Sequence, residues 1–576
     1  MTGATQDEKA PVEQAVLLED WPLRPWILAV LGAIAGLGVY ELLEDFDTEP
    51  LRAALAALMF FGAIAAGFVL RPQRLAEAAI FALGIGLVMA GIAYFAVNAH
   101  ESHAGEEFAF AAGVFFSVLA IPLFQANFHR LRWDTPYPAT HFYVWTDAVS
   151  AGGAFLFMGL SWALLWLLHG LFSLIGIDVI EELIQTGWFS AMFVGLTFGA
   201  ALGVLRNQLG IIGTLQRVVM LVFSLLAVPF ALALLIFLVI LLFSGGSALW
   251  DATDSATPVL LTCAVGCFVL SNAVVRDDDA QRSSSAFMQS AALVLAFCIL
   301  PLTVFAAISM GIRIDQHGLS PERIWALIAI VIACSYGLAY WVGLARGRMA
   351  GWSQYLRRAN MHLAVVTCGI ALVLAFPLID FGGISAKNQV ARLDAGKVSL
   401  EEFDLAALRW DFGDAGREVL AELAEREGEV AQLAQAAQAQ TERPYDYGYA
   451  RRVEADYNLR VQPDDPELRE FIIGKLQEQP WKCQNQCLAL DIGRNADGQR
   501  QVALIQHRAF EIYTMGGDEP ADTPIPEPDR NLTSGELKED SVVEIHTIPQ
   551  RYIVIDGVPM QAPLGAEGEV AIEGDN

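Results

Sequence analysis

The chain has 576 residues, of which 55% are apolar and only 17% are charged, and its mean hydropathy is +0.44. Soluble proteins carry about 25% charged residues, so this composition excludes a single soluble globular enzyme. The formal net charge is −28, and the stretch from Asp380 to Asn576 holds 38 acidic residues against 19 basic ones. Because nucleic-acid binding needs Lys and Arg to neutralise phosphates, we expect no nucleic-acid partner.

The amino-terminal segment, residues 1–24, is predicted to lie in the cytoplasm. Its first twenty residues are acidic and contain neither a basic start nor a small-residue cleavage site. Both features are typical of secretory signal peptides. The first apolar run is therefore expected to be a retained membrane anchor.

Between residues 25 and 381 the apolar residues fall into about eleven runs that could each cross a bilayer, which takes about twenty residues of helix. Most of the polar loops between them are short, so consecutive helices are expected to lie antiparallel. We predict an all-α polytopic transmembrane helix bundle over residues 25–381, with the lipid bilayer as its partner. The runs are Pro25–Leu43, Ala53–Leu70, Leu75–Val97, Phe108–Phe128, Ala148–Ile175, Trp188–Leu205, Val218–Phe243, Pro258–Val275, Ala286–Ile312, Ile324–Leu344 and Met361–Phe381.

Arginine is distributed unevenly among the loops. One alternating set of loops contains twelve arginines, whereas the other set contains only Arg52, Arg313 and Arg323. Loops rich in basic residues stay in the cytoplasm, so the amino terminus is predicted to be cytoplasmic. With an odd number of spans, the carboxy-terminal domain is then periplasmic. The sequence thus predicts a multi-pass protein of the bacterial inner (cytoplasmic) membrane.

Ionisable residues near the middle of a span would be the strongest sign of a transport or catalytic site. The few candidates are expected near the ends of their spans, where side chains reach the membrane interface. They are Glu77, Asp147, His169, His362 and Asp380. This pattern weakens the case for a proton-coupled carrier.

The first outer loop contains a cluster of acidic residues, Glu41, Glu44, Asp45 and Asp47. Membrane-embedded lipid-linked glycosyltransferases place an acidic pair in their first outer loop. Their loop is, however, much longer than the about ten residues found here. The cluster is a candidate catalytic loop, with a solvated surface loop as the simpler interpretation.

The outer loop from Arg313 to Arg323 is a second candidate site. Its Ser320 can cap the following helix, with Pro321 at the first helical position. Arg313 and Arg323 are two of only three arginines in their set of loops, so each should have a partner. The first alternative is an ion pair with Asp315, Asp380 or the acidic tail. The second is an anionic ligand or lipid headgroup, because paired guanidinium groups suit phosphate geometry.

After Phe381 the sequence has the character of a soluble protein, and residues 382–564 are predicted to form a periplasmic α+β domain. Helical patterns come first and strand patterns follow, and residues 565–576 are expected to be a disordered tail. The predicted helices cover residues 386–396, 399–410, 415–439 and 466–479, and the predicted strands cover residues 487–492, 502–513, 542–548 and 552–555.

Two of the seven cysteines, Cys483 and Cys487, lie in this domain. In an oxidising compartment a close pair favours a disulfide. Free thiols, or a metal site completed by His507 or His546, are the alternatives. The other five cysteines lie in apolar runs, where cysteine usually acts as a small apolar residue. We expect no resident metal or cofactor, since no phosphate-binding loop, dinucleotide fingerprint or zinc-protease motif occurs.

Three stretches are shared with a known family. The first is Gly318–Arg323 after a hydrophobic span, the second is Leu171–Ile177, and the third is a polar segment with Gln389, Arg392, Leu393, Asp404, Leu408, Gly413 and Gly416. Through them the chain resembles, from about Trp145 to Leu423, the bacterial polytopic inner-membrane proteins described as domain of unknown function 4153. This resemblance implies a location and an architecture, but no activity and no catalytic residues.

Three functional interpretations follow. The first is a non-enzymatic envelope protein, whose bundle anchors a periplasmic domain that senses or scaffolds, with an anionic lipid or an envelope protein as partner. The second is a permease for a small or lipidic substrate. The third is a membrane-embedded lipid-linked transferase that uses the first outer loop. No residue pattern identifies a substrate, and an enzyme is the less expected class.

Overall fold

The protein is described here from a computed structural model, which divides into two compact units, Met1–Thr441 and Glu442–Asn576. The structure describes residues 21–44, 49–98, 102–244, 256–279, 282–283, 285–441, 443, 459–478, 483, 487–494, 498–506, 509–515, 554–555 and 558–559. The first unit is helical throughout its described part, and the second contains both strands and a helix.

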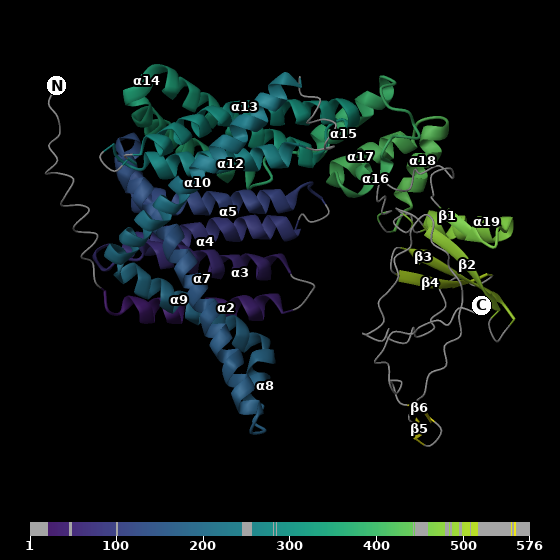
Figure 1. The fold of residues 1–576 in the computed structure, drawn as a ribbon, viewed down its shortest axis with the longest axis horizontal. Coiled ribbons are helices and arrows are strands. Elements are labelled where there is room, and N and C mark those ends of the chain that lie inside the picture. Colours follow the sequence, from purple (N-terminus) through teal and green to yellow (C-terminus); the bar gives the residue numbers. More distant parts are fainter. Residues whose placement is uncertain are drawn as a thin grey trace, which may run out of the picture. The chain divides into compact units, whose positions relative to one another are not determined.

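Four consecutive helices lie side by side at the start of the first unit (Figure 1). They are α2 (Arg24–Leu43), α3 (Pro50–Val69), α4 (Leu75–Asn98) and α5 (Glu106–Gln125). Helix α2 packs closely on α9 (Gly187–Asn207), because glycines line both helices at their crossing. A Cβ atom at Gly32 would lie 2.0 Å from the carbonyl oxygen of Gly195, so only small residues permit this approach.

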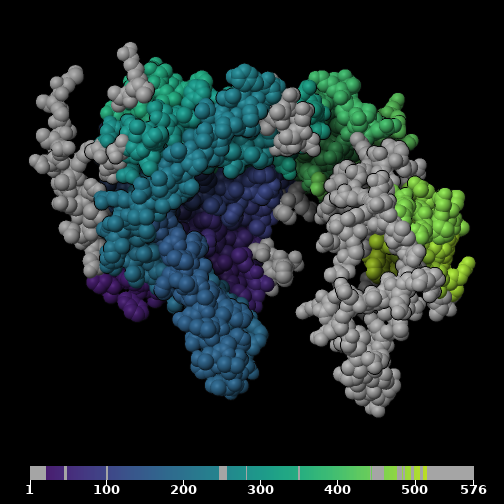
Figure 2. All heavy atoms as spheres, in the orientation of Figure 1, coloured from purple at the N-terminus to yellow at the C-terminus, as the bar shows by residue number. Residues whose placement is uncertain are grey.

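Two long helices cross this layer. Helix α7 (Tyr137–Ser173) leads into the short α8 (Val179–Gln185), and α10 (Leu209–Phe243) follows α9. The buried residues of α7 all lie in its first half, between Thr140 and Ala154. Its apolar second half is exposed and projects with α8 beyond the neighbouring helices (Figure 2). An apolar surface of this kind is expected to face lipid. Short helical segments at Pro72–Arg74, Phe128–Leu131 (α6) and Arg132–Asp134 complete this region.

The largest apolar core forms between the later helices α12 (Thr257–Val275), α13 (Ala286–His317) and α14 (Pro321–Leu374), together with α10. Fully buried side chains such as Leu295, Leu302 and Trp352 fill this core.

The element α14 is a helical hairpin and not one straight helix. Residues 340 and 360 of a straight helix would lie about 30 Å apart, yet the hydroxyl of Tyr340 lies 2.8 Å from the side-chain oxygen of Asn360. A Cβ atom at Gly347 would lie 2.4 Å from the Cα atom of Trp352. The chain therefore reverses between Gly347 and Trp352, and α14 supplies two antiparallel arms.

Ten helices of the described chain are long and apolar enough to cross a membrane, and α14 is represented among them by its first arm, Pro321–Gly347. The predicted polytopic helix bundle is thereby confirmed. The second arm of α14 corresponds to the eleventh predicted span. The largest difference concerns α7, which begins at Tyr137, well before the predicted start at Ala148. The polar and aromatic residues of this extra stretch pack against other helices, so it is helical although it is not continuously apolar.

Four short helices after the last span form what we call the helical cap: α15 (Phe381–Asp394), α16 (Leu405–Trp410), α17 (Gly413–Ala424) and α18 (Glu429–Gln438). They share an apolar core and belong to the same compact unit as the bundle. The division after Thr441 therefore lies later than the predicted domain start at residue 382. The single helix predicted over residues 415–439 is two helices, because Gly428 has a φ of +91°, which ends the helical path.

The second unit contains a four-stranded sheet in the order β1-β2-β3-β4. Strand β1 (Leu459–Gln462) pairs in parallel with β2 (Cys487–Arg494), while β3 (Arg500–Gln506) and β4 (Ala509–Thr514) continue the sheet antiparallel. Helix α19 (Pro466–Glu478) shares the apolar core of the sheet, and Val554–Ile555 (β5) pairs with Val558–Pro559 (β6). The prediction missed β1 and treated the β3–β4 hairpin as one strand. The strand predicted over residues 542–548 lies outside the described residues.

Candidate functional site

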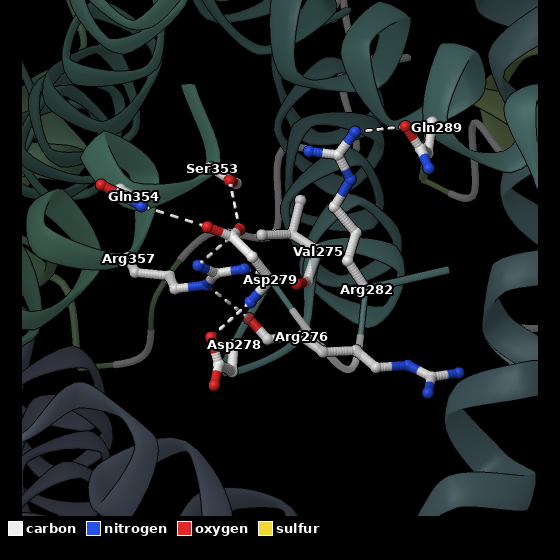
Figure 3. Close-up of polar contacts among 9 residues, drawn as sticks. All are labelled: Val275, Arg276, Asp278, Asp279, Arg282, Gln289, Ser353, Gln354 and Arg357. Atoms are coloured by element: carbon white, nitrogen blue, oxygen red, sulfur yellow. Dashed lines mark hydrogen bonds and ion pairs between the residues drawn. The ribbon is translucent and has the colours of Figure 1, made fainter. Parts of the chain in front are cut away.

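The loop between α12 and α13 meets the second arm of α14 in a network of polar side chains (Figure 3). The carboxylate of Asp279 accepts hydrogen bonds from Ser353 at 2.8 Å, from Gln354 at 3.1 Å and from Nη1 of Arg357 at 2.9 Å. The guanidinium of Arg357 also donates to the carbonyl oxygens of Val275, at 3.0 Å, and of Arg276, at 3.1 Å. Arg357 thus holds the carboxyl end of α12 against the α14 hairpin.

The electrostatics of this network favour its ionised form. Partial burial raises the pKa of the Asp279 carboxyl, but hydrogen bonds from Ser353 and Gln354 and the charge of Arg357 outweigh this effect, so its pKa lies below the ordinary value. Arg276 has a φ of +54°, which is uncommon for a residue with a side chain. In Figure 3 its guanidinium points away from Asp279.

A closed triangle of buried hydrogen bonds lies next to this network on the same helices. The amide nitrogen of Asn360 donates to Asn272 at 2.7 Å, Asn272 donates to Tyr340 at 2.8 Å, and Tyr340 donates to Asn360 at 2.8 Å. All three residues are buried, and Asn360 also donates to the hydroxyl of Tyr137 at 3.4 Å. Polar residues that pair between membrane helices stabilise the association of those helices. The triangle thus joins α12 to both arms of α14.

A second polar cluster lies where α2, α5, α7 and α9 converge. The carboxylate of Asp147 accepts a hydrogen bond from Gln125 at 2.5 Å and lies 3.8 Å from the guanidinium of Arg206. Arg206 is buried, and its own carbonyl oxygen accepts a hydrogen bond from Arg24 at 2.9 Å. A charged pair buried among membrane helices is expensive and therefore a candidate functional feature.

These two clusters were not identified from the sequence. The sequence predicts Asp147 at the end of the span Ala148–Ile175, but α7 begins ten residues before Asp147, which is therefore buried among the helices. The sequence does not single out Arg357, Asn360 and Asn272, because Asn272 lies on α12 and the other two lie on the second arm of α14. Single-sequence patterns do not reveal which segments meet. The available signal was the presence of Asn272 and Asn360 at positions that border apolar runs.

The predicted outer loop is held by the first helix of the cap. The side chain of Arg392 donates to the carbonyl oxygens of Asp315 at 2.7 Å and Gln316 at 2.9 Å, and Gln389 donates to those of His317 at 2.9 Å and Leu319 at 2.8 Å. These carbonyls include the unpaired ones at the carboxyl end of α13, which positive side chains stabilise. The contact joins two of the stretches on which the family resemblance rests.

Arg323 also contributes to this end of α13. Its guanidinium donates to the carbonyl oxygens of Gly318 at 2.8 Å and His317 at 3.3 Å, and its backbone nitrogen is capped by Ser320. Within the described residues neither Arg313 nor Arg323 forms an ion pair with Asp315 or Asp380. The partner of Arg323 is thus the negative end of the preceding helix, an arrangement that the two predicted alternatives did not include.

The remaining candidate acids lie at separate places. Asp380 caps α15 by accepting a hydrogen bond from the backbone nitrogen of Gly383 at 2.8 Å. Glu41 and Glu44 lie at the end of α2, where Glu44 accepts a hydrogen bond from Tyr40 at 3.1 Å. Asp45 and Asp47 lie outside the described residues.

Cys483 and Cys487 are joined by a disulfide in the second unit, and both are buried in its core. His507 and His546, the alternative metal ligands, lie outside the described residues. In the part of the chain that the structure describes, no group of three His, Cys, Asp or Glu side chains is placed to hold a metal ion.

Comparison with known proteins gives a match at the level of a family. The model described as "Domain of unknown function (DUF4153)" matches residues 54–423 of the chain. No curated protein and no solved structure matches it. The matched region includes the second to fourth predicted spans, which the sequence resemblance did not reach, and it ends within α17 of the helical cap.

Proposed function

Since the chain belongs to the family described as domain of unknown function 4153, whose description names no activity, we propose a function from the geometry. The protein is a multi-pass protein of the bacterial inner membrane that senses or scaffolds components of the cell envelope. Its bundle carries the helical cap and the carboxy-terminal unit on the periplasmic side.

The observation that carries this proposal is the direct attachment of the helical cap to the bundle. Arg392 and Gln389 bind the carboxyl end of α13, and the backbone nitrogen of Asp414 donates to the carbonyl oxygen of Ser102 at 2.9 Å. Gly413 lies so close to this loop that a Cβ atom there would be 2.5 Å from the Ser102 carbonyl oxygen. A cap attached through backbone atoms moves with the bundle. This rigid attachment suits a protein that senses or scaffolds components of the cell envelope.

Contacts at the ends of the helices support the alternating path of the chain. Helix ends and loops of the arginine-rich set contact one another, and so do those of the opposite set, while the assignment of the first set to the cytoplasm rests on its arginines. On the arginine-rich side the contacts join Arg71 to Tyr143, Arg130 to Glu77, and Arg357 to the carbonyl oxygen of Arg276. On the other side they join the cap to residues 314–319 and to Ser102.

A permease is the second candidate, and the buried pair of Asp147 and Arg206 favours it. Charged groups inside a bundle mark substrate or ion pathways in many transporters. The two proposals differ in what they require outside the bundle: sensing or scaffolding needs both the docked cap and the carboxy-terminal unit, whereas a permease would keep its pathway without the carboxy-terminal unit.

A complementation experiment separates them. A deletion strain, characterised by envelope and lipid profiling, receives the full chain, the chain ended after Thr441, or the Gly413→Ala variant, with Gly396→Ala as the matched control. The sensing or scaffolding proposal predicts that the full chain and the control restore the profile, while the other two fail although they reach the membrane in normal amounts. Full restoration by the chain ended after Thr441 would refute the proposal and favour the permease.

A further inference from the structure

A shallow cleft lies where α3 ends, α4 begins and α5 ends, among loops of the arginine-rich set. Its volume of ≈ 20 Å³ exceeds the about 10–15 Å³ that a water molecule needs. The cleft can therefore take in one small polar group, such as an oxygen atom of a phosphate, but no chain. It is lined by the apolar residues Val69, Ala78 and Phe124 and by the polar residues Arg71, Arg74, Glu77, Gln125, Asn127 and His129.

Two arginines of the cleft are oriented by neutral partners. Arg71 precedes the short helical segment Pro72–Arg74, and Arg74 ends it. The guanidinium of Arg71 donates to the hydroxyl of Tyr143 at 2.8 Å, and that of Arg74 donates to the side-chain oxygen of Asn127 at 2.7 Å. Within the described residues neither arginine forms an ion pair with a carboxylate. Their positive charges are therefore available to a ligand.

The other ionisable groups near the cleft do not cancel this positive charge. Glu77 lines the cleft, but its carboxylate forms an ion pair with Arg130. Burial lowers the pKa of His129, and the charge of Arg130 lowers it further, so the His129 ring is neutral at pH 7. The cleft thus presents two uncompensated positive charges, those of Arg71 and Arg74.

An exposed apolar stripe runs along α4 from this end of the helix. Ile80, Leu83 and Leu87 expose 72%, 55% and 56% of their surface. They follow one another at intervals of three and four residues, so they lie on one face of the helix. In a multi-pass membrane protein such a face is expected to contact lipid chains. The positively charged cleft therefore lies at the end of a lipid-facing surface.

These observations define the class of ligand. Guanidinium groups bind phosphate through charge-assisted hydrogen bonds, and basic pockets between membrane helices bind anionic lipid headgroups. A cationic headgroup such as choline would be repelled by the two arginines. We propose that Arg71 and Arg74 bind the phosphate of an anionic phospholipid whose acyl chains lie along the exposed face of α4.

The bound lipid stabilises the bundle. Arg71 contacts Tyr143 of α7, and Arg74 contacts Asn127 after α5, so the phosphate joins the loop between α3 and α4 to two further helices. A ligand that binds only the folded state raises the melting temperature. This site does not depend on the proposed sensing or scaffolding function, and its test requires no measurement of activity.

The binding test uses the full chain in detergent, titrated with phosphatidylglycerol or with phosphatidylcholine of the same acyl chains. Native mass spectrometry counts the bound lipids, and the melting temperature is measured on the same samples. We expect saturable binding of phosphatidylglycerol that is at least tenfold tighter than binding of phosphatidylcholine. Glycerol phosphate carries the phosphate without acyl chains and should compete at least tenfold less well than phosphatidylglycerol.

Two variants and one control assign the binding to the cleft. Arg74→Gln should weaken phosphatidylglycerol binding about fivefold, the effect of one arginine near an anionic headgroup. Arg74→Lys keeps the charge without the planar fork of donors, so it should weaken binding less than Arg74→Gln. Arg346→Gln is the matched control and should leave binding unchanged, because Arg346 is an exposed arginine of the same set of loops that lies outside the cleft.

Equal binding of phosphatidylglycerol by the Arg74→Gln and Arg346→Gln variants would overturn the proposed site. Equal binding of phosphatidylcholine and phosphatidylglycerol by the unaltered protein would overturn the preference for an anionic headgroup. If glycerol phosphate competed as well as phosphatidylglycerol, the cleft would be a site for a soluble phosphate compound, and the lipid would be overturned as its occupant.

Discussion

The hydroxyl of Tyr340 donates a hydrogen bond of 2.8 Å to the side-chain oxygen of Asn360, although the two residues lie twenty positions apart in the same helical element, α14. Only a reversal of the chain can bring them together. With the second arm of α14 counted as the eleventh predicted span, the number of passes is odd, and the proposed topology expects the cap on the side opposite the amino terminus.

The hydrogen-bonded triangle is expected to stabilise this hairpin. Asn360→Ala removes bonds to Asn272 and Tyr340, and each bond between membrane helices contributes about 0.6 kcal/mol on average. We therefore expect the free energy of unfolding to fall by about 1–2 kcal/mol, measured by unfolding in detergent micelles.

The matched control replaces all three members of the triangle, as Asn272→Leu, Tyr340→Phe and Asn360→Leu together. This combination leaves no member of the triangle without its partner, and such concerted apolar replacement can be nearly neutral. A triple variant that is less stable than Asn360→Ala would contradict the assigned role of the triangle.

The carboxylate of Asp279 predicts a dependence of stability on pH. Its pKa is lower in the folded protein than in the unfolded chain, so its contribution is present above the unfolded pKa, about 3.9, and is lost as the pH falls through the folded pKa. Asp279→Asn should therefore lower the melting temperature at neutral pH. On acidification the melting temperature of the variant should fall less than that of the unaltered protein. If the melting temperatures of the two proteins fell by the same amount between pH 7 and pH 3, the ion pair with Arg357 would not be the source of the pH dependence.

Arg392 is predicted to hold the cap on α13. Arg392→Ala removes hydrogen bonds to the carbonyl oxygens of Asp315 and Gln316, and we expect about 1.5–3 kcal/mol less stability, the range for a hydrogen bond that involves a charged group. Hydrogen exchange in α15 should become faster, while exchange in α2 and α9 stays unchanged. Arg426→Ala, which breaks an exposed ion pair with Asp394, is the control and should have a smaller effect. Equal protection of α15 in both variants would contradict the prediction.

Much of the helical architecture was predictable because apolar runs of span length depend on local sequence alone. The partners of Arg323 and Asp147 were not predictable, since both are set by which helices meet. For Arg323 the charge bias of its loops predicts a partner, but the sequence points only to acidic side chains or an anionic ligand, whereas the structure gives it the carboxyl end of α13. The helix predicted over residues 415–439 has strong helical propensity on both sides of Gly428, and the conformation of this one glycine divides it.

The close approach of the cap to the loop before α5 is tested with two glycines of nearly equal backbone conformation. Gly413 and Gly396 have φ values of +66° and +65°, so alanine costs a similar amount of backbone energy at each, about 1–2 kcal/mol. Only at Gly413 would the new Cβ atom clash, 2.5 Å from the Ser102 carbonyl oxygen, whereas Gly396 has open space. Gly413→Ala should therefore lower the melting temperature more and expose the cap to proteolysis. Equal melting temperatures would show that the cap does not dock as described.

The most direct test of the account is the side of the membrane on which the cap lies. Alkaline phosphatase needs disulfides and is active only in an oxidising compartment, so it is fused after Thr441 and, in a second protein, after Gly347 at the turn of the α14 hairpin. The account predicts an active fusion after Thr441 and an inactive fusion after Gly347. An inactive fusion after Thr441 together with an active one after Gly347 would contradict both the sidedness and the proposed function.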